Sequence, residues 1–119
     1  LGVMLANVFF EHDILELSTK NRDGFHIFLS EIIATFGLIF IIFATLKDGK
    51  ITIAASVATY IMAGYWFTSS TSFANPAVAI ARTFTDSFTG INYLNTPTYI
   101  LAEFLGALIA VFIFKKLIN

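Results

Sequence analysis

The sequence contains no cysteine, only two prolines and few charged residues. Without cysteine, the chain forms no disulfide and no thiolate metal site. Charged residues occupy 13% of the 119 positions, whereas a soluble globular domain has about a quarter. The net charge is −1, so there is no basic surface for nucleic acid or for anionic lipid headgroups. These shortages argue against an ordinary soluble domain and against a nucleic-acid partner.

Apolar residues, in contrast, are abundant. They make up 57% of the chain, fourteen of them are phenylalanine, and the mean hydropathy is +0.81. So many aromatic residues with so little proline exclude a disordered or collagen-like chain. The composition therefore predicts an all-α integral membrane protein embedded in a lipid bilayer.

The beginning of the chain does not resemble a secretory signal. It starts at Leu1 within an apolar run, and no basic region precedes that run. We therefore expect the chain to be part of a larger protein. Residues 1–10 are too short to span a bilayer and are interpreted as the end of a preceding span. Residues 11–24 hold seven charged or imidazole groups and are expected to form an aqueous, extracellular loop.

Three later segments are apolar enough to cross a membrane, which places one unit over residues 25–119. The first span, about 25–46, would be about 33 Å long, against a hydrocarbon core of about 30 Å. Its only charge is Glu31. The other spans are expected over about 51–67, which carries no charge, and about 98–114, which carries only Glu103.

The segment between the second and third spans does not fit a simple hairpin. Residues 68–72 are all serine or threonine and lead into an apolar run that predicts a helix over about 75–84. Asn75 is a good N-cap, and Pro76 suits the first helical position. Such a helix measures about 15 Å, half the hydrocarbon thickness. It can enter the bilayer and return, provided that its irregular backbone faces protein or water.

Basic residues near the span ends predict the orientation. Four lysines fall at one end of the three spans and two basic residues at the other; they are Lys47, Lys50, Lys115 and Lys116 against Lys20 and Arg22. Because basic residues are enriched on the cytoplasmic side, this pattern favours a cytoplasmic C-terminus.

The tripeptide Asn75-Pro76-Ala77, at the start of a half-length helix after two spans and before a third, resembles the aquaporin (major intrinsic protein) family. The stretch that begins at Glu31 (EIIATFG) is similar to the E-x-x-x-T-F signature in the first helix of a family repeat. The stretch that contains Glu103 (AEFLGA) is similar to the Q-x-x-G-A signature of the last helix, with Glu in place of the usual Gln.

Family members contain two such repeats in inverted orientation. The resemblance therefore implies an aquaporin-like three-helix repeat with a re-entrant half-helix, which is half of a six-span right-handed bundle. The partners that it implies are an N-terminal repeat of the same channel, which is missing here, and the other subunits of a homotetramer.

Val78 bears on which half this is. The first motif of the family usually reads N-P-A-V and the second N-P-A-R, so Val78 matches the first. Residues 1–24 nevertheless look like the end of a preceding helix and the long central loop, and the chain ends soon after Lys115-Lys116. We interpret the chain as the C-terminal half. A group of bacterial channels associated with arsenic resistance is similar in this departure, which implies a bacterial inner membrane and small neutral solutes, glycerol-like or arsenite.

The physics of the half-helix is compatible with a pore. A helix N-terminus presents unpaired N–H groups and about half a positive charge, and the Asn75 amide adds a donor. Water or a polyol would be hydrogen-bonded there, whereas protons and cations would be disfavoured. Alignment with the family places the constriction at Val78, Ser72 and Ala63, or Gly64 if the register shifts by one. All are small, which implies a wide and weakly selective pore.

Three charged residues remain open to two readings. Glu31 either binds solute or, as its family position implies, accepts hydrogen bonds from N–H groups of the re-entrant loop and so supports it. Glu103 is also interpreted as structural. Arg82 lies one turn after Val78 on the same helical face, at the expected pore mouth. Its side chain either leans back toward the constriction, or extends to the outer interface or pairs with Asp86.

Enzyme function has no support in the sequence. There is no Ser/His/Asp grouping and no phosphate loop, and His12 and His26 lack nearby ligand partners, so neither a metal nor a cofactor is expected. Two alternatives to a channel for water and small solutes stay open. One is a non-conducting small membrane subunit or vestigial fragment, and the other is part of a secondary transporter with broken helices.

Overall fold

Helices account for all the regular secondary structure in the computed structural model, which describes residues 1–118. No strand occurs in that range. The α-helices are α1 (Gly2–Phe9), α2 (Phe25–Thr45), α3 (Lys50–Phe67), α4 (Pro76–Ala81) and α5 (Thr96–Ile118). Two short 3₁₀ turns, η1 (Leu46–Asp48) and η2 (Arg82–Phe84), continue α2 and α4. The predicted all-α class is therefore confirmed.

Two helices are long and apolar enough to cross a membrane. They cover Phe25–Asp48 and Thr96–Ile118, with mean hydropathies of 2.4 and 2.0. Only 17% and 28% of their most apolar windows are buried, so they are not core helices of a soluble protein, which would be mostly buried. The segment expected as the second span is also helical, as α3, which has 18 residues. It is less apolar than the other two helices and is not among those that qualify as membrane spans by length and hydropathy.

The observed helices differ from the expected segments mainly at their ends. Helix α5 begins at Thr96 and continues to Ile118, so it is longer at both ends than the expected 98–114. The expected half-helix is a six-residue α-helix from Pro76 that tightens into a 3₁₀ turn at Arg82.

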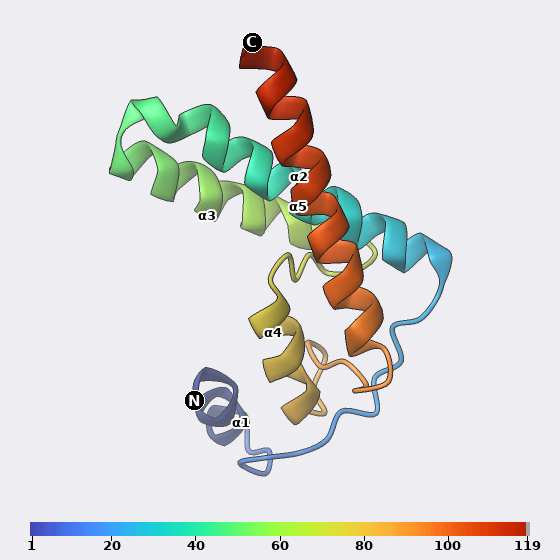
Figure 1. Ribbon diagram of the computed structural model, residues 1–119. Coiled ribbons are helices and arrows are strands. Elements are labelled where there is room, and N and C mark those ends of the chain that lie inside the picture. The colour runs from blue at the N-terminus through green and yellow to red at the C-terminus, as the bar shows by residue number, and fades with distance from the viewer. Residues whose placement is uncertain (119) are drawn as a thin grey trace.

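Helices α2 and α5 cross in close contact, and α3 lies beside α2 (Figure 1). At the crossing, Gly106 faces the backbone of α2, where a Cβ would collide with the carbonyl oxygen of Ile32. Helix α3 approaches α2 at Gly37, and there Tyr60 donates its hydroxyl to the carbonyl of Ala34 at 2.9 Å. The absence of a side chain at these glycines lets the helices approach.

Helices α1 and α4 lie together near the N-terminal end of α5, away from its C-terminus (Figure 1). A small buried cluster joins α4 to α5 and consists of Phe73, Ala79, Ile91 and Tyr99. The rings of Phe73 and Tyr99 pack with centroids 4.9 Å apart. This cluster fixes α4 against the rest of the fold.

Candidate functional site

The loop of residues 68–75, which connects α3 to α4, has an unusual backbone. Thr71, Ser72 and Ala74 all have positive φ angles, of 63°, 51° and 49°. Residues other than glycine rarely adopt this left-handed conformation, and they hold it only where the surroundings fix it. The contacts that fix this loop come from α2 and α5.

Glu31 of α2 is fully buried beneath the loop. Its carboxylate accepts a hydrogen bond from the backbone N–H of Phe73 at 3.3 Å and another from that of Ala74. Both N–H groups belong to the non-helical backbone directly before Asn75. A carboxylate with two oxygens can accept from both at once, which explains why this charged residue stands inside an apolar helix.

Ser30, the neighbour of Glu31, extends the same contact. Its hydroxyl oxygen accepts from the N–H of Ser69 at 3.0 Å and from that of Ser70 at 3.3 Å. Two adjacent residues of α2 therefore pair four backbone N–H groups of the loop.

Helix α5 holds the loop from another side. The hydroxyl of Tyr99 donates to the carbonyl of Ser70 at 3.0 Å, and Glu103 accepts from the N–H of Asn75 at 3.0 Å. The second carboxylate oxygen of Glu103 is buried without a hydrogen-bond partner among the described residues. Glu31 and Glu103 thus contact consecutive stretches of the same loop.

The motif Asn75-Pro76-Ala77 begins α4. The side-chain oxygen of Asn75 accepts from the N–H of Ala77 at 2.9 Å, and Pro76 occupies the first helical turn. This geometry is that of a capped helix start. Asn75 and Ala77 are both exposed, so the motif lies on an open face of the chain.

The three residues expected at the constriction lie in three different environments. Val78 is half-buried against the cluster of Phe73, and Ser72 is buried. Ser72 packs against Gly64 of α3. A Cβ at Gly64 would lie 2.6 Å from the Ser72 hydroxyl oxygen, so only glycine leaves room for this contact. Ala63 is exposed and lines a groove between α2 and α3.

Arg82 does not form the ion pair with Asp86 that was one of its expected roles. That expectation is wrong, because Asp86 instead accepts from the backbone N–H of Thr19 at 2.7 Å and from its hydroxyl at 2.9 Å. These two hydrogen bonds lower the pKa of Asp86 below its ordinary value. The Cζ atom of Arg82 lies 4.3 Å from the centroid of the Phe73 ring, a cation–π contact.

Residues 11–24, here called the strap, run beside the segment that follows α4. The N–H of Ser18 donates to the carbonyl of Thr83 at 2.9 Å, and the N–H of Asn92 donates to that of Lys20 at 2.8 Å. The strap is therefore not a free loop. It is tied to the chain around the end of α4.

Arg22 is the strap residue that the sequence reading missed. The charge pattern predicts a solvated side chain in an aqueous loop, but only 7% of Arg22 is exposed. Its Nε and Nη2 donate to the carbonyls of Gly90 and Phe88, both at 2.7 Å, and its Cζ lies 5.3 Å from the centroid of the Phe73 ring. Burial lowers the pKa of Arg22. Nothing in the charge pattern of residues 11–24 distinguishes it from Lys20.

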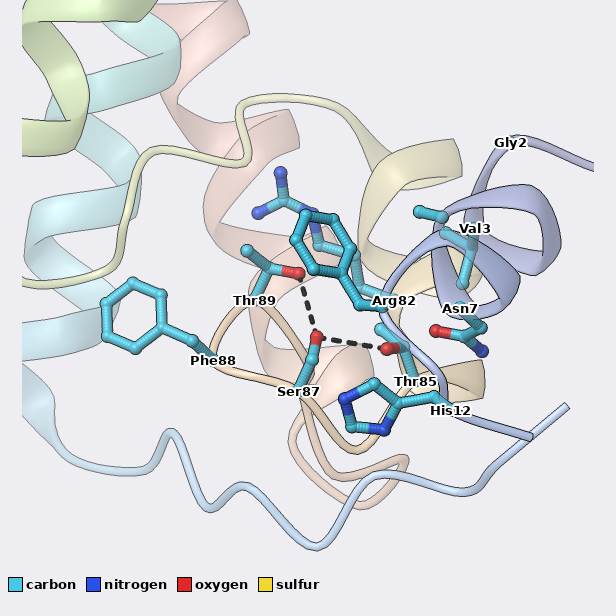
Figure 2. A pocket seen from close by; sticks show the side chains of 11 residues that line it. Gly2, Val3, Asn7, His12, Arg82, Thr85, Ser87, Phe88 and Thr89 are labelled. Atoms are coloured by element: carbon cyan, nitrogen blue, oxygen red, sulfur yellow. Dashed lines mark hydrogen bonds between the residues drawn. The ribbon is translucent and has the colours of Figure 1, made fainter. Parts of the chain in front are cut away.

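A cavity of about 550 Å³ lies between α1 and the segment after α4 (Figure 2). The hydroxyl of Ser87 links those of Thr85 and Thr89 on its wall, at 3.0 and 3.2 Å. His12 also lines the cavity and pairs with Glu16 of the strap at 2.8 Å. Within residues 1–118, no three potential ligands gather as they would around a metal ion.

Comparison with known proteins identifies one informative relative. The aquaglyceroporin AqpS of Rhizobium meliloti (strain 1021) is 44% identical over 118 residues, which is 99% of this chain and 51% of the relative. The chain thus spans about half the length of the curated relative that it matches. No family model matches the chain, and no solved structure matches it significantly. Given this identity over nearly the whole chain, and two apolar helices of membrane-spanning length, the chain is an integral membrane protein that is similar to one half of a member of the aquaporin (major intrinsic protein) family.

Proposed function

We propose that the chain is the C-terminal repeat of a passive channel for water and small neutral solutes of about glycerol size, arsenite included. The similarity to an aquaglyceroporin supports a channel for small solutes. The observation that carries the proposal is the position of Asn75. Its backbone is fixed by Glu103, its side chain caps α4, and the residue is exposed on the open face of the fold.

The loop before α4 supports a re-entrant arrangement. Glu31 and Glu103 both lie about two turns inside apolar helices, which is about 10 Å from the helix starts. A loop that bonds to both is carried to that depth. Irregular backbone is tolerated in the hydrocarbon region only where protein or water surrounds it, and here α2 and α5 pair its N–H groups. In this proposal α2, α3 and α5 span the membrane, and α4 lies within it.

The Asn75 amide is the proposed solute donor. Because its side-chain oxygen is used in the cap, its Nδ2 hydrogens remain to bind the oxygen of water or a polyol. The N-terminal end of α4 adds positive potential, which disfavours cations. Val78, Ser72 and Ala63 or Gly64 bring no charge and little bulk to the constriction, which favours neutral solutes larger than water.

The proposed assembly is completed by a first repeat that faces this one, with four such channels in a homotetramer. Lys115 and Lys116 stand in the last turn of α5. By the bias of basic residues toward the cytoplasm, the C-terminus faces the cytoplasm of a bacterial inner membrane.

The test uses the natural full-length protein in proteoliposomes, with water and glycerol flux followed by stopped-flow light scattering. The wild-type protein should conduct both without an ion gradient. Asn75→Asp retains the capping oxygen but replaces the donor with an acid, so glycerol flux should fall about tenfold and sodium leak should rise. Asn92→Asp is the matched control, because that side-chain oxygen caps a turn outside the proposed path.

The outcomes separate the alternatives. Absence of flux through correctly folded wild-type protein would support a non-conducting subunit or vestigial fragment. Flux that requires an ion gradient would support a secondary transporter. Equal fluxes and leaks in wild type and Asn75→Asp would remove Asn75 from the solute path.

A further inference from the structure

We propose that the groove between α2 and α3 continues the solute path from the loop of residues 68–75 toward the cytoplasm, and that the hydroxyl of Thr59 binds a hydroxyl group of a passing polyol there. The inference rests on the proposed channel function and deepens it. It assigns a specificity role to a residue that lies outside the motifs of the sequence.

The first support is the position of the groove, which follows α3 where that helix lies beside α2 (Figure 1). Its volume is about 550 Å³. One end lies at Ala63, next to the contact between Gly64 and Ser72 of the loop. The other end reaches Thr45, the last residue of α2, and Ala55, which is about 12 Å from Ala63 along α3. The groove therefore leads from the loop toward the α2–α3 turn, the end that the proposed orientation places at the cytoplasm.

The second support is the hydroxyl of Thr59 in a mostly apolar wall. Two other hydroxyl groups of the groove are bonded to α2, since Thr45 and Tyr60 donate to backbone carbonyls at 2.8 and 2.9 Å. Thr59 lies one turn before Ala63 on the same face of α3, and its side chain is exposed. A threonine hydroxyl both donates and accepts, so it can pair with either role of a solute hydroxyl.

This arrangement matches the chemistry of a polyol, which has an apolar C–H face and an edge of hydroxyl groups. Ile41, Ala44 and Ala55 give the groove an apolar wall for the C–H face. A solute hydroxyl that leaves water for such a groove is unfavourable without a hydrogen-bond partner, and Thr59 provides one. Water is smaller and remains bonded to neighbouring waters, so its passage depends less on a single wall hydroxyl.

The experiment separates the hydroxyl from the shape of the side chain. In proteoliposomes of the natural full-length protein, Thr59→Val retains the branched shape but replaces the hydroxyl with a methyl group. Glycerol flux should fall about fivefold relative to water flux. Thr59→Ser retains the hydroxyl and should keep the wild-type ratio. Thr52→Val is the matched control, because Thr52 is also exposed on α3 but does not line the groove, and its hydroxyl donates to the carbonyl of Asp48 at 3.0 Å.

A second measurement tests the path itself. The chain contains no cysteine, so Thr59→Cys adds the first thiol to this half of the channel. A bulky, membrane-impermeant thiol reagent should react with it and block both water and glycerol flux. Ala58→Cys provides the control, because Ala58 is exposed but does not line the groove, and the reagent should leave its fluxes unchanged. Wild type treated with the reagent accounts for thiols in the other half.

The outcomes are distinguishable. If folded wild type conducts no solute, the proposed function itself is wrong. If wild type conducts and Thr59→Val keeps the wild-type ratio of glycerol to water flux, the role of the Thr59 hydroxyl is overturned. If the reagent leaves the fluxes of Thr59→Cys unchanged, the groove is filled by the first repeat or faces lipid, and the proposed path is overturned. Should Thr59→Val fail to fold, as judged by thermal unfolding, the labelling of Thr59→Cys decides.

Discussion

Two irregular stretches of backbone, the loop of residues 68–75 and the strap of residues 11–24, are held in different ways. Side chains of α2 and α5 accept from the loop: the Ser30 hydroxyl and the carboxylates of Glu31 and Glu103 bind five of its N–H groups. The strap is tied to the chain after α4 both by backbone-to-backbone hydrogen bonds and by side chains: Asp86 and Asn95 accept from strap N–H groups, and Arg22 donates to two carbonyls. The carboxylates that hold the loop are buried, whereas the hydrogen bonds of Asp86 to the strap are exposed. Buried backbone groups need a partner within the protein, and exposed ones can also bond to water.

Loss of Glu31 should have the largest effect, because it breaks the side-chain pairing of the loop. Glu31→Ala leaves the N–H groups of Phe73 and Ala74 buried and unpaired, so we expect destabilisation of about 3–5 kcal/mol or failure to fold. The measurement is thermal unfolding of the purified protein in detergent.

Two variants sharpen that result. Glu103→Gln retains an acceptor for the Asn75 N–H and should change the free energy of unfolding by less than about 1 kcal/mol. Glu16→Ala removes a surface contact with His12 and should also change it by less than about 1 kcal/mol. A loss in Glu31→Ala no larger than in Glu16→Ala would contradict our account of the loop.

Loss of Arg22 should have an intermediate effect, confined to the strap. Arg22→Ala leaves the carbonyls of Gly90 and Phe88 without their charged donor, which should destabilise the protein by about 1–3 kcal/mol. Hydrogen exchange should accelerate at Ser18 and Asn92, whose N–H groups bond across the same boundary, and stay slow at Phe73. Acceleration at Phe73 would mean that strap and loop open as one unit.

Protonation of Asp86 should have the smallest effect. Its pKa is lowered in the fold by the Thr19 N–H and hydroxyl, so its contribution is present above the unfolded value of about 3.9 and is lost as pH falls through the folded pKa. As the pH falls below about 4, the protection of the Thr19 amide, taken as its exchange rate relative to the intrinsic rate at the same pH, should decrease in wild type. Asp86→Asn should show little of this dependence; an equal dependence in both would assign it to another group.

The elements of the fold were predictable from local patterns in the sequence. Long apolar runs marked α2 and α5, and Asn75-Pro76 marked the start of α4, because capping and helix length are local properties. Glu31 could be linked to the loop because a charge inside an apolar run needs polar partners. Ser30 and Tyr99 carried no such signal, since serine and tyrosine are ordinary in membrane helices.

Contacts between distant segments were not predictable. Asp86 accepts from Thr19 and not from Arg82 because the fold brings the strap beside it. Thr19 lies 67 residues earlier in the chain than Asp86. The spacing of four residues to Arg82 suggested a local pair, and a distant hydrogen-bond donor replaced it. Arg22 was misread for the same reason, since its carbonyl partners belong to the segment after α4.

The division of the loop's contacts between α2 and α5 has a consequence for the order of assembly. Residues 68–75 are synthesised after α2 but before Tyr99 and Glu103, so their partners on α5 reach the membrane later than the loop itself. A backbone with unpaired polar groups is not stable in hydrocarbon. In the proposed re-entrant arrangement, the loop would therefore stay at the membrane surface until α5 has inserted, and α4 would enter the bilayer last although it precedes α5 in the sequence.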